Sequence, residues 1–296
     1  MSDELVRVES LRKTYANRNA WGRRTGEIRA VDGVDLAIRA GETLAVVGES
    51  GSGKSTLGRA ILQMEEPTSG AIHYRGVDLT AASRAVRAAA HRSMQVIFQD
   101  PFSSLNPHRT ALQNVLEPLG VLGASDDPIA AATEALAAVG IEGDAVHKRP
   151  RAFSGGQRQR IAIARALAVR PDFIVCDEPV SALDVTIQAQ VMRLLQRLQK
   201  DYALTYLFIS HDLAVVREIA DRTAVMMRGR ILELAPTGEL FAAPRHPYTQ
   251  RLLEAVLVPD PHAARARLAQ IAARPAAPVA EVGVLTEVAP GHFVEV

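Results

Sequence analysis

The sequence predicts an α/β fold in which a mostly parallel β-sheet is covered by helices. Short, continuously apolar segments at residues 43–47, 173–176 and 204–210 have the length and composition of strands that are buried on both faces. Helical segments lie between them, and chains that alternate strands with helices form parallel sheets. A glycine-rich loop that carries a lysine follows the first of these strands, and such a loop is typical of folds that bind phosphate groups.

The N-terminal part, residues 5–47, is expected to be rich in strands. Residues 5–8 alternate loosely, and residues 31–38 alternate apolar with polar side chains. Between them, the arginine-rich segment from Arg18 to Arg29 is interpreted as a solvated loop. Thr43 to Val47 is β-branched and apolar, which suits a strand buried on both faces.

The remaining elements are expected in alternation. They are helices over 55–64, 110–148, 157–169 and 187–200, and strands over 94–98, 173–176 and 204–210. Pro118 and Gly120 are expected to break the longest helical segment. After about residue 258 the composition shifts to Ala, Pro and Arg, which predicts a main domain over 1–258 and a short, loosely structured C-terminal extension over 259–296, with Arg274 to Ala280 as a loose tail.

Bulk properties exclude several classes of protein. A formal net charge of +1 gives no reason to expect a nucleic-acid or lipid partner. The single cysteine, Cys176, lies in an apolar run, so we expect a buried core residue and no disulfide or multi-cysteine metal site. The acidic N-terminus lacks the apolar segment of a signal peptide, and no apolar run approaches the ~18 residues of a membrane helix. We therefore expect a cytoplasmic protein that reaches a membrane only through partners.

A phosphate-binding loop is the most specific motif of the chain. The pattern G-x-x-x-x-G-K-[ST] is matched by Gly48-Glu49-Ser50-Gly51-Ser52-Gly53-Lys54-Ser55, with Thr56 next in the helix. Its glycines let backbone N–H groups converge on phosphate oxygens, and the helix adds its positive end. We expect Lys54 to reach the β- and γ-phosphates of ATP and the Ser55 hydroxyl to bind Mg²⁺. The alternative, a Gly/Ser loop with a chance lysine, is disfavoured by the strand–loop–helix context.

Two carboxylates follow the buried strand at 173–176. Asp177 is expected to help hold Mg²⁺, and Glu178 to orient and polarise the attacking water. An apolar run that ends in Asp-Glu is by itself usually a plain strand end. Paired with the lysine loop, it predicts a nucleotide-hydrolysis site.

A second glycine-containing motif resembles the signature of the ABC (ATP-binding cassette) ATPases. It is Phe153-Ser154-Gly155-Gly156-Gln157, which begins with Phe in place of the commoner Leu. Small residues at a helix N-terminus suit a phosphate, as in the lysine loop. Ser154 also fits a plain N-cap for the helix that follows, and both interpretations can hold together.

Further motifs occur in the order of that family. Gln99 resembles its Q-loop glutamine, which implies contact with the γ-phosphate and Mg²⁺, and His211 resembles its switch histidine, which implies a catalytic role. Ser181-Ala182-Leu183-Asp184 resembles its D-loop, with Asp184 as a nucleotide-site residue. Tyr15 resembles the aromatic residue that stacks on adenine, although ordinary strand packing is the alternative and an insertion-like segment, Asn17 to Arg29, follows it.

The resemblance covers about residues 5–258 and implies the fold of an ABC ATPase. This is a P-loop NTPase with a mostly parallel sheet core, an antiparallel β subdomain and a helical signature subdomain at about 100–168. Arg245-His246-Pro247-Tyr248-Thr249 and the residues around Asn106 and Glu178 resemble the ATPases of oligopeptide/dipeptide importers, above all the dipeptide "F" subunit. That group usually carries cysteines in its C-terminal extension, whereas this chain has none after Cys176.

The resemblance also implies partners. Two such subunits would pair head to tail, so that Ser154, Gly156 and Gln157 act on ATP held by the other chain. Two membrane permeases, and indirectly a solute-binding protein, would complete an importer of peptides or a solute such as nickel, with this chain peripheral on the inner face of the membrane. The alternative is a soluble ABC ATPase of DNA maintenance or translation. About 100 residues without sustained heptads separate Lys54 from Ser154, and the chain holds one cassette, so the importer is preferred.

Overall fold

The structure, a computed structural model, describes residues 4–18, 24–100, 104–256 and 283–296. Two sheets form within these residues, one of eight strands and one of four. The larger sheet has the order β11 (Leu285–Ala289), β12 (His292–Glu295), β10 (Arg230–Pro236), β9 (Arg222–Met227), β3 (Thr43–Val47), β8 (Thr205–Ser210), β7 (Phe173–Asp177) and β6 (Met94–Ile97). The strands from β9 to β6 are parallel, which confirms the predicted core.

The central strands separate two hydrophobic cores. In β3, Ala45 and Val47 join the core on one face, while Leu44 and Val46 join the core on the other. A strand that is buried on both faces is mostly apolar along its whole length, because successive side chains point in opposite directions. The continuous apolar runs of the sequence have this physical origin.

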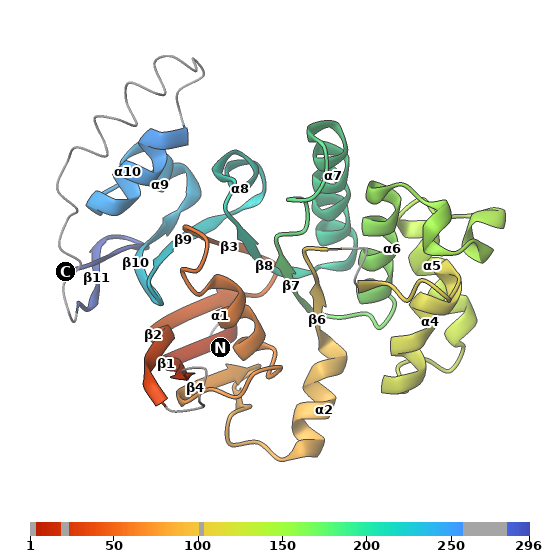
Figure 1. The fold of residues 1–296 in the computed structure, drawn as a ribbon, viewed down its shortest axis with the longest axis horizontal. Helices are drawn as coiled ribbons and strands as arrows, with labels where there is room; N and C mark the ends of the chain where they lie inside the picture. Colours follow the sequence, from red (N-terminus) through yellow and green to blue (C-terminus); the bar gives the residue numbers. More distant parts are fainter. Residues whose placement is uncertain (1–3, 19–23, 101–103, 257–282) are drawn as a thin grey trace.

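Different layers cover the two faces of the larger sheet (Figure 1). One face packs against α1 (Lys54–Ile61) and the antiparallel sheet, whose order is β2 (Arg24–Arg39), β1 (Glu4–Arg18), β4 (Ser69–Tyr74) and β5 (Val77–Asp78). The other face carries α6 (Gly155–Leu167), α7 (Val185–Tyr202), α8 (Leu213–Ile219), α9 (Thr237–Ala242) and α10 (Pro247–Val256). Helix α2 (Arg84–Ser93) leads into β6.

Helices α4 (Ala111–Leu122), α5 (Pro128–Ala138) and α6 form a group to one side of the sheet (Figure 1). The short 3₁₀ turns η1 (Gly143–His147) and η2 (Pro150–Ala152) lead from α5 to α6. The predicted break at Pro118 and Gly120 is wrong, because α4 continues through both residues. The helix ends at Gly123, whose left-handed φ of 57° is a conformation that glycine adopts at little cost.

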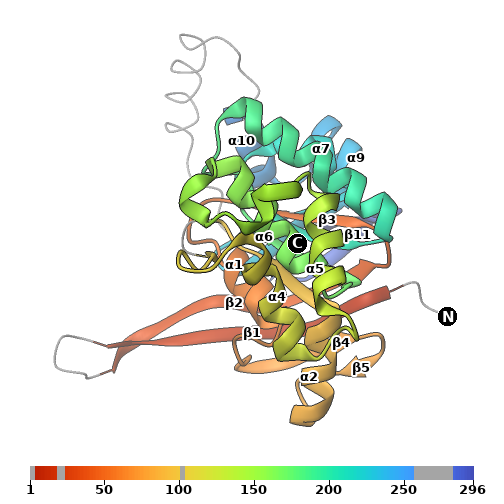
Figure 2. The same ribbon diagram turned by 90° about the vertical axis from the view of Figure 1, so that its right-hand side faces the viewer.

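The arginine-rich segment near the N-terminus is not the loop that the sequence predicted. Its described part continues the pairing of β1 with β2, with Tyr15 opposite Ile28 and Asn17 opposite Gly26. Figure 2 shows the resulting long hairpin, which extends from the body of the molecule. The prediction failed because hydropathy reports burial, whereas backbone hydrogen bonds pair exposed strands equally well.

The C-terminal extension is also more ordered than predicted over residues 283–296. Strands β11 and β12 form a hairpin, and β12 pairs with β10 through Glu233 opposite Val294. The hairpin therefore enlarges the main sheet beyond the expected domain boundary at residue 258, because β10 offers an edge for pairing. The predicted loose tail at 274–280 lies outside the described residues. Among the described helices, none combines the length and apolarity needed to span a membrane.

Candidate functional site

The loop between β3 and α1 has a backbone that requires glycine. Gly48, Gly51 and Gly53 adopt φ angles of 154°, 78° and 105°. A Cβ at Gly48 would lie 2.0 Å from the carbonyl oxygen of Met226, and one at Gly53 would lie 2.0 Å from that of Ala30. The loop is therefore pressed against β9 and β2, and its backbone N–H groups are left near the N-terminus of α1.

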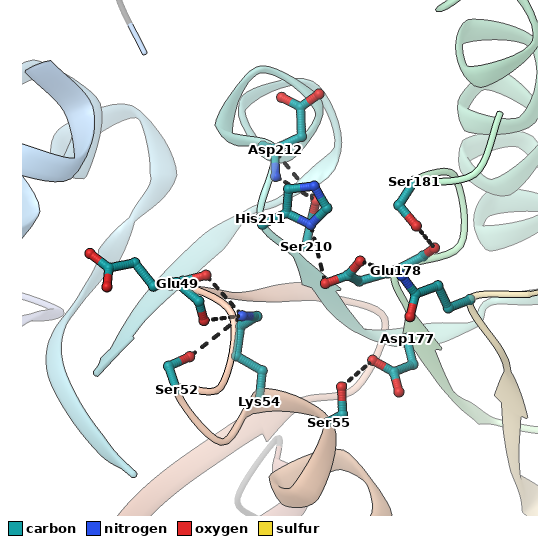
Figure 3. A network of polar contacts seen from close by, with 12 residues as sticks. Glu49, Ser52, Lys54, Ser55, Asp177, Glu178, Ser181, Ser210, His211 and Asp212 are labelled. Atoms are coloured by element: carbon teal, nitrogen blue, oxygen red, sulfur yellow. Dashed lines mark hydrogen bonds and ion pairs between the residues drawn. The ribbon is translucent and has the colours of Figure 1, made fainter. Parts of the chain in front are cut away.

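Lys54 is buried at the start of α1 and is held by the loop itself. Its Nζ donates hydrogen bonds to the carbonyl oxygens of Gly48 and Glu49, each at 2.8 Å (Figure 3). Burial lowers the pKa of the ammonium group, and the carboxylates of Glu178 and Asp177 oppose that effect. The loop thus presents a positive charge whose position is set by its own backbone.

Asp177 and Ser55 form an oxygen pair beside the lysine. The Ser55 Oγ donates a hydrogen bond of 2.7 Å to Oδ1 of Asp177, which ends β7. Burial raises the pKa of the Asp177 carboxyl, and the hydrogen bond from Ser55 partly offsets that rise. A hydroxyl and a carboxylate at one place match the hard oxygen ligands that Mg²⁺ prefers, so the donor set fits this ion.

Glu178 follows β7, and its carboxylate contacts side chains that follow the two neighbouring strands, β6 and β8. Its Oε2 accepts a hydrogen bond of 2.9 Å from Nε2 of Gln99, which follows β6, and its Oε1 lies 3.1 Å from Nδ1 of His211, which follows β8 (Figure 3). Its backbone is left-handed, with φ 49°, and its N–H donates to the carbonyl oxygen of Ile209 at 3.0 Å. Such a conformation in a non-glycine residue is costly and persists where neighbours hold it, so the carboxylate is fixed in direction.

Lys54, Ser55, Gln99, Glu178 and His211 line one open cavity, whereas Asp177 is not among its lining residues and contacts Ser55. Its lining is Ile28, Arg29, Ala30, Ser50, Gly51, Gly53, Lys54, Ser55, Thr56, Gln99, Glu178 and His211. The sequence did not predict that Ile28, Arg29 and Ala30 line this cavity. These residues are far from the loop in the chain, and the pairing of β2 with β1 brings them to it. Tyr15 is absent from the lining, and its hydroxyl is hydrogen-bonded to Glu65. It lies opposite Ile28 in the hairpin, so the two side chains share a face.

The signature residues lie apart from this cavity. Ser154 caps α6 in a capping box: its Oγ accepts from the N–H of Gln157 at 3.3 Å, and its own N–H donates to Oε1 of Gln157 at 3.0 Å. Asp184 caps α7 in a similar way, with Oδ1 accepting from the N–H of Ile187 at 3.1 Å. Neither Ser154 nor Asp184 is among the cavity residues, so one chain by itself does not bring the signature to Lys54.

The fold and the cavity together define a class of protein. A parallel sheet with a lysine loop after one strand and a carboxylate pair after another is the arrangement of P-loop nucleoside triphosphatases. The glycine geometry fits a polyphosphate, because it exposes backbone N–H groups beside a buried cation.

Comparison with known proteins identifies the family within this class. The profile described as "ABC transporter" matches residues 31–181, and a second, "Oligopeptide/dipeptide transporter, C-terminal region", matches residues 232–281. The chain belongs to the ABC transporter family and is an ATPase of the ATP-binding cassette type.

Relatives and solved structures agree with this assignment. YkfD of Bacillus subtilis (strain 168) is 50% identical over 79% of this chain and 72% of its own length. The oligopeptide transport ATP-binding protein AppF of the same organism is 45% identical over 86% of this chain and 79% of its own length. The dimeric cassette MJ0796 bound to ADP and Pi has a TM-score of 0.69 at 30% identity, covering 78% of this chain and 98% of that structure. CbiO1 from Clostridium perfringens has a TM-score of 0.70 at 27% identity, over 91% and 99%.

Proposed function

We propose that this chain hydrolyses ATP to power the import of oligopeptides or dipeptides, or of a related solute such as nickel, through two partner permeases. The convergence of Gln99 and His211 on Glu178, beside the lysine loop, is the observation that carries the hydrolytic part. The peptide part is supported by the match of residues 232–281 to the oligopeptide/dipeptide C-terminal region and by relatives such as AppF.

Nucleotide binding is assigned to the loop and its surroundings. The backbone N–H groups of residues 48–53, with the start of α1 at Lys54, Ser55 and Thr56, would hold the phosphates, and Lys54 would pair with the β- and γ-phosphates. Tyr15 and Ile28 offer one face of the hairpin for the base. Ser55, Asp177 and Gln99 would hold Mg²⁺, which when bound neutralises charge on the phosphates.

Hydrolysis is assigned to Glu178. Its carboxylate would accept the proton of the attacking water, and the contacts from Gln99 and His211 direct it into the cavity. His211 is placed to stabilise charge that develops at the same point. Gln99 joins this site to the segment that leads to α4, so it would pass the nucleotide state to a permease.

A complete site would need a second subunit, either a copy of this chain or a related one. Ser154, Gly155, Gly156 and Gln157 lie outside the cavity of their own chain, and the N-terminus of α6 is free to meet phosphate held by a partner, with Asp184 near the contact. In this proposal residues 1–258 form the nucleotide-binding domain, to whose sheet the hairpin at 283–296 adds two strands, and residues from about 100 to 168 are its helical subdomain. The chain would lie on the inner face of the membrane through its permeases, receive solute indirectly from a solute-binding protein, and bind no nucleic acid.

Uptake in a strain that lacks this chain tests the proposal. Uptake of labelled dipeptides, oligopeptides or nickel should fall in that strain, should return with the wild-type chain, and should stay low with Glu178→Gln. Unchanged uptake of all three in the deletion strain, with normal ATPase activity of the purified chain, would favour the alternative of an ABC ATPase without a transport role.

A further inference from the structure

Gln159, in the second turn of α6, is a buried amide without a partner. Its side chain is fully buried. Both Nε2 and Oε1 lack a hydrogen-bond partner among the residues that the structure describes. An unpaired buried amide costs the full desolvation of its donor and acceptor, and native proteins contain few of them.

Gln159 shares a face of α6 with two glycines that pack against the D-loop, Ser181–Asp184, and the start of α7. It lies four residues after Gly155 and three after Gly156, so the three share one face of the helix. A Cβ at Gly155 would lie 3.5 Å from Cδ2 of Leu183, and one at Gly156 would lie 2.3 Å from Cγ2 of Ile187. The two glycines therefore set a close approach between this face and the segment that follows Glu178.

A second glutamine, on the α7 side of the contact between α6 and α7, has a side-chain amide that is hydrogen-bonded. Nε2 of Gln188, in α7, donates hydrogen bonds to the carbonyl oxygens of Val180 at 3.0 Å and Leu183 at 2.9 Å. Gln188 thus holds the D-loop in the present conformation, whereas Gln159 contributes no hydrogen bond to it.

We propose that Gln159 is a positioning residue whose amide bonds the backbone of the D-loop only when ATP closes the pair of subunits. Helix α6 lies beside α4 and α5 (Figure 1). In this proposal closure shifts this group over the start of α7 and brings the amide to the loop. The signature of one chain and the segment after its own Glu178 then move as a unit. A side chain that is unsatisfied in one state and bonded in the other favours the second state by the difference. This inference rests on the proposed function, because it assigns Gln159 to the ATP-bound state.

Replacing the amide by an apolar side chain of similar length separates the two states. In the full chain without nucleotide, Gln159→Met should raise the Tm by about 2–4 °C, because an unpaired buried amide is removed. In a chain that also carries Glu178→Gln, occlusion of radiolabelled ATP should require about tenfold more ATP than with Glu178→Gln alone. A purely structural residue would not move these two measurements in opposite directions.

Gln188→Met is the matched control, and it should lower the Tm because it removes two hydrogen bonds of the resting state. A lower Tm for Gln159→Met would overturn the inference, since the amide would then be bonded in the resting chain. A higher Tm with an unchanged ATP requirement would also overturn it, since the amide would gain nothing on closure. If Glu178→Gln alone occludes no ATP at any protein concentration, the proposed shared site itself fails, and the inference fails with it.

Discussion

The carboxylate of Glu233 in β10 lies 2.7 Å from Nε2 of His292 in β12, and both side chains are buried. The same carboxylate accepts hydrogen bonds from the backbone N–H groups of Arg245 at 2.8 Å and His246 at 3.0 Å. One buried acid therefore joins the last long strand of the sheet, the segment before α10 and the C-terminal hairpin. A carboxylate is retained in such a place only when its oxygens are bonded.

Glu233→Gln should lower the free energy of unfolding by about 2–4 kcal/mol, because an amide nitrogen cannot accept a hydrogen bond and one donor loses its partner. Denaturant unfolding measures the change. Glu239→Gln is the matched control: its carboxylate is 56% exposed and 3.9 Å from Nδ1 of His292, so a change below about 0.5 kcal/mol is expected. Equal effects of the two substitutions would contradict the role given to Glu233.

Gly156→Ala should destabilise the chain by about 1–3 kcal/mol, because the new Cβ would lie 2.3 Å from Cγ2 of Ile187. Gly155→Ala is the control, since its Cβ would make an ordinary 3.5 Å contact with Leu183. Adding Ile187→Ala should recover part of the loss at Gly156, which a double-mutant cycle measures. A coupling free energy of zero between positions 156 and 187 would show that the close contact does not cause the destabilisation.

Lys54→Ala should lose most ATP binding, by at least about tenfold in affinity, because the triphosphate loses the cation that the loop holds in place. Equilibrium titration with ATP measures the loss. Lys200→Ala, at an exposed position near the end of α7, is the control and should bind normally. Normal affinity in Lys54→Ala would count against the phosphate assignment.

Glu178→Gln should keep ATP binding and slow hydrolysis by about 10²–10⁴-fold, trapping the closed pair of subunits. The amide preserves the shape of the side chain and cannot act as a base. Phosphate release measures turnover, and light scattering measures the trapped dimer. Near-normal turnover in the assembled transporter would move the base role to another group, with His211 the first candidate.

Turnover of the wild-type chain should rise with protein concentration, because a complete site needs a signature from a second chain. Mixing Lys54→Ala with Ser154→Arg should restore one good site per heterodimer, formed by the intact loop of one chain and the intact signature of the other. ATP occlusion is the better measurement if turnover needs both sites. The shared site would be contradicted by a turnover rate that does not depend on protein concentration, a monomer in light scattering and no ATP occlusion in the mixture. The assignment of phosphate binding to the lysine loop would remain, because it rests on residues of one chain.

The sequence alone determined the parallel core and the residues of the phosphate site. Strands that are buried on both faces are mostly apolar, so 43–47, 173–176 and 204–210 were visible as predominantly apolar runs. Cys176 was placed in the core as predicted. The lysine loop was visible because its glycines and its lysine are adjacent in the chain, and local geometry dictates their spacing.

Only the tertiary structure decided the elements that depend on distant partners. No element was predicted between residues 65 and 93 or after residue 210, where β4, α2, β9 and β10 lie. The long hairpin carries Ile28 and Arg29 to the cavity through backbone hydrogen bonds. The C-terminal hairpin is joined to β10 through backbone hydrogen bonds and the buried contact between His292 and Glu233. Such pairing depends on which strands meet in space. Hydropathy along the sequence does not predict it, because backbone N–H and C=O groups are the same in every residue except proline.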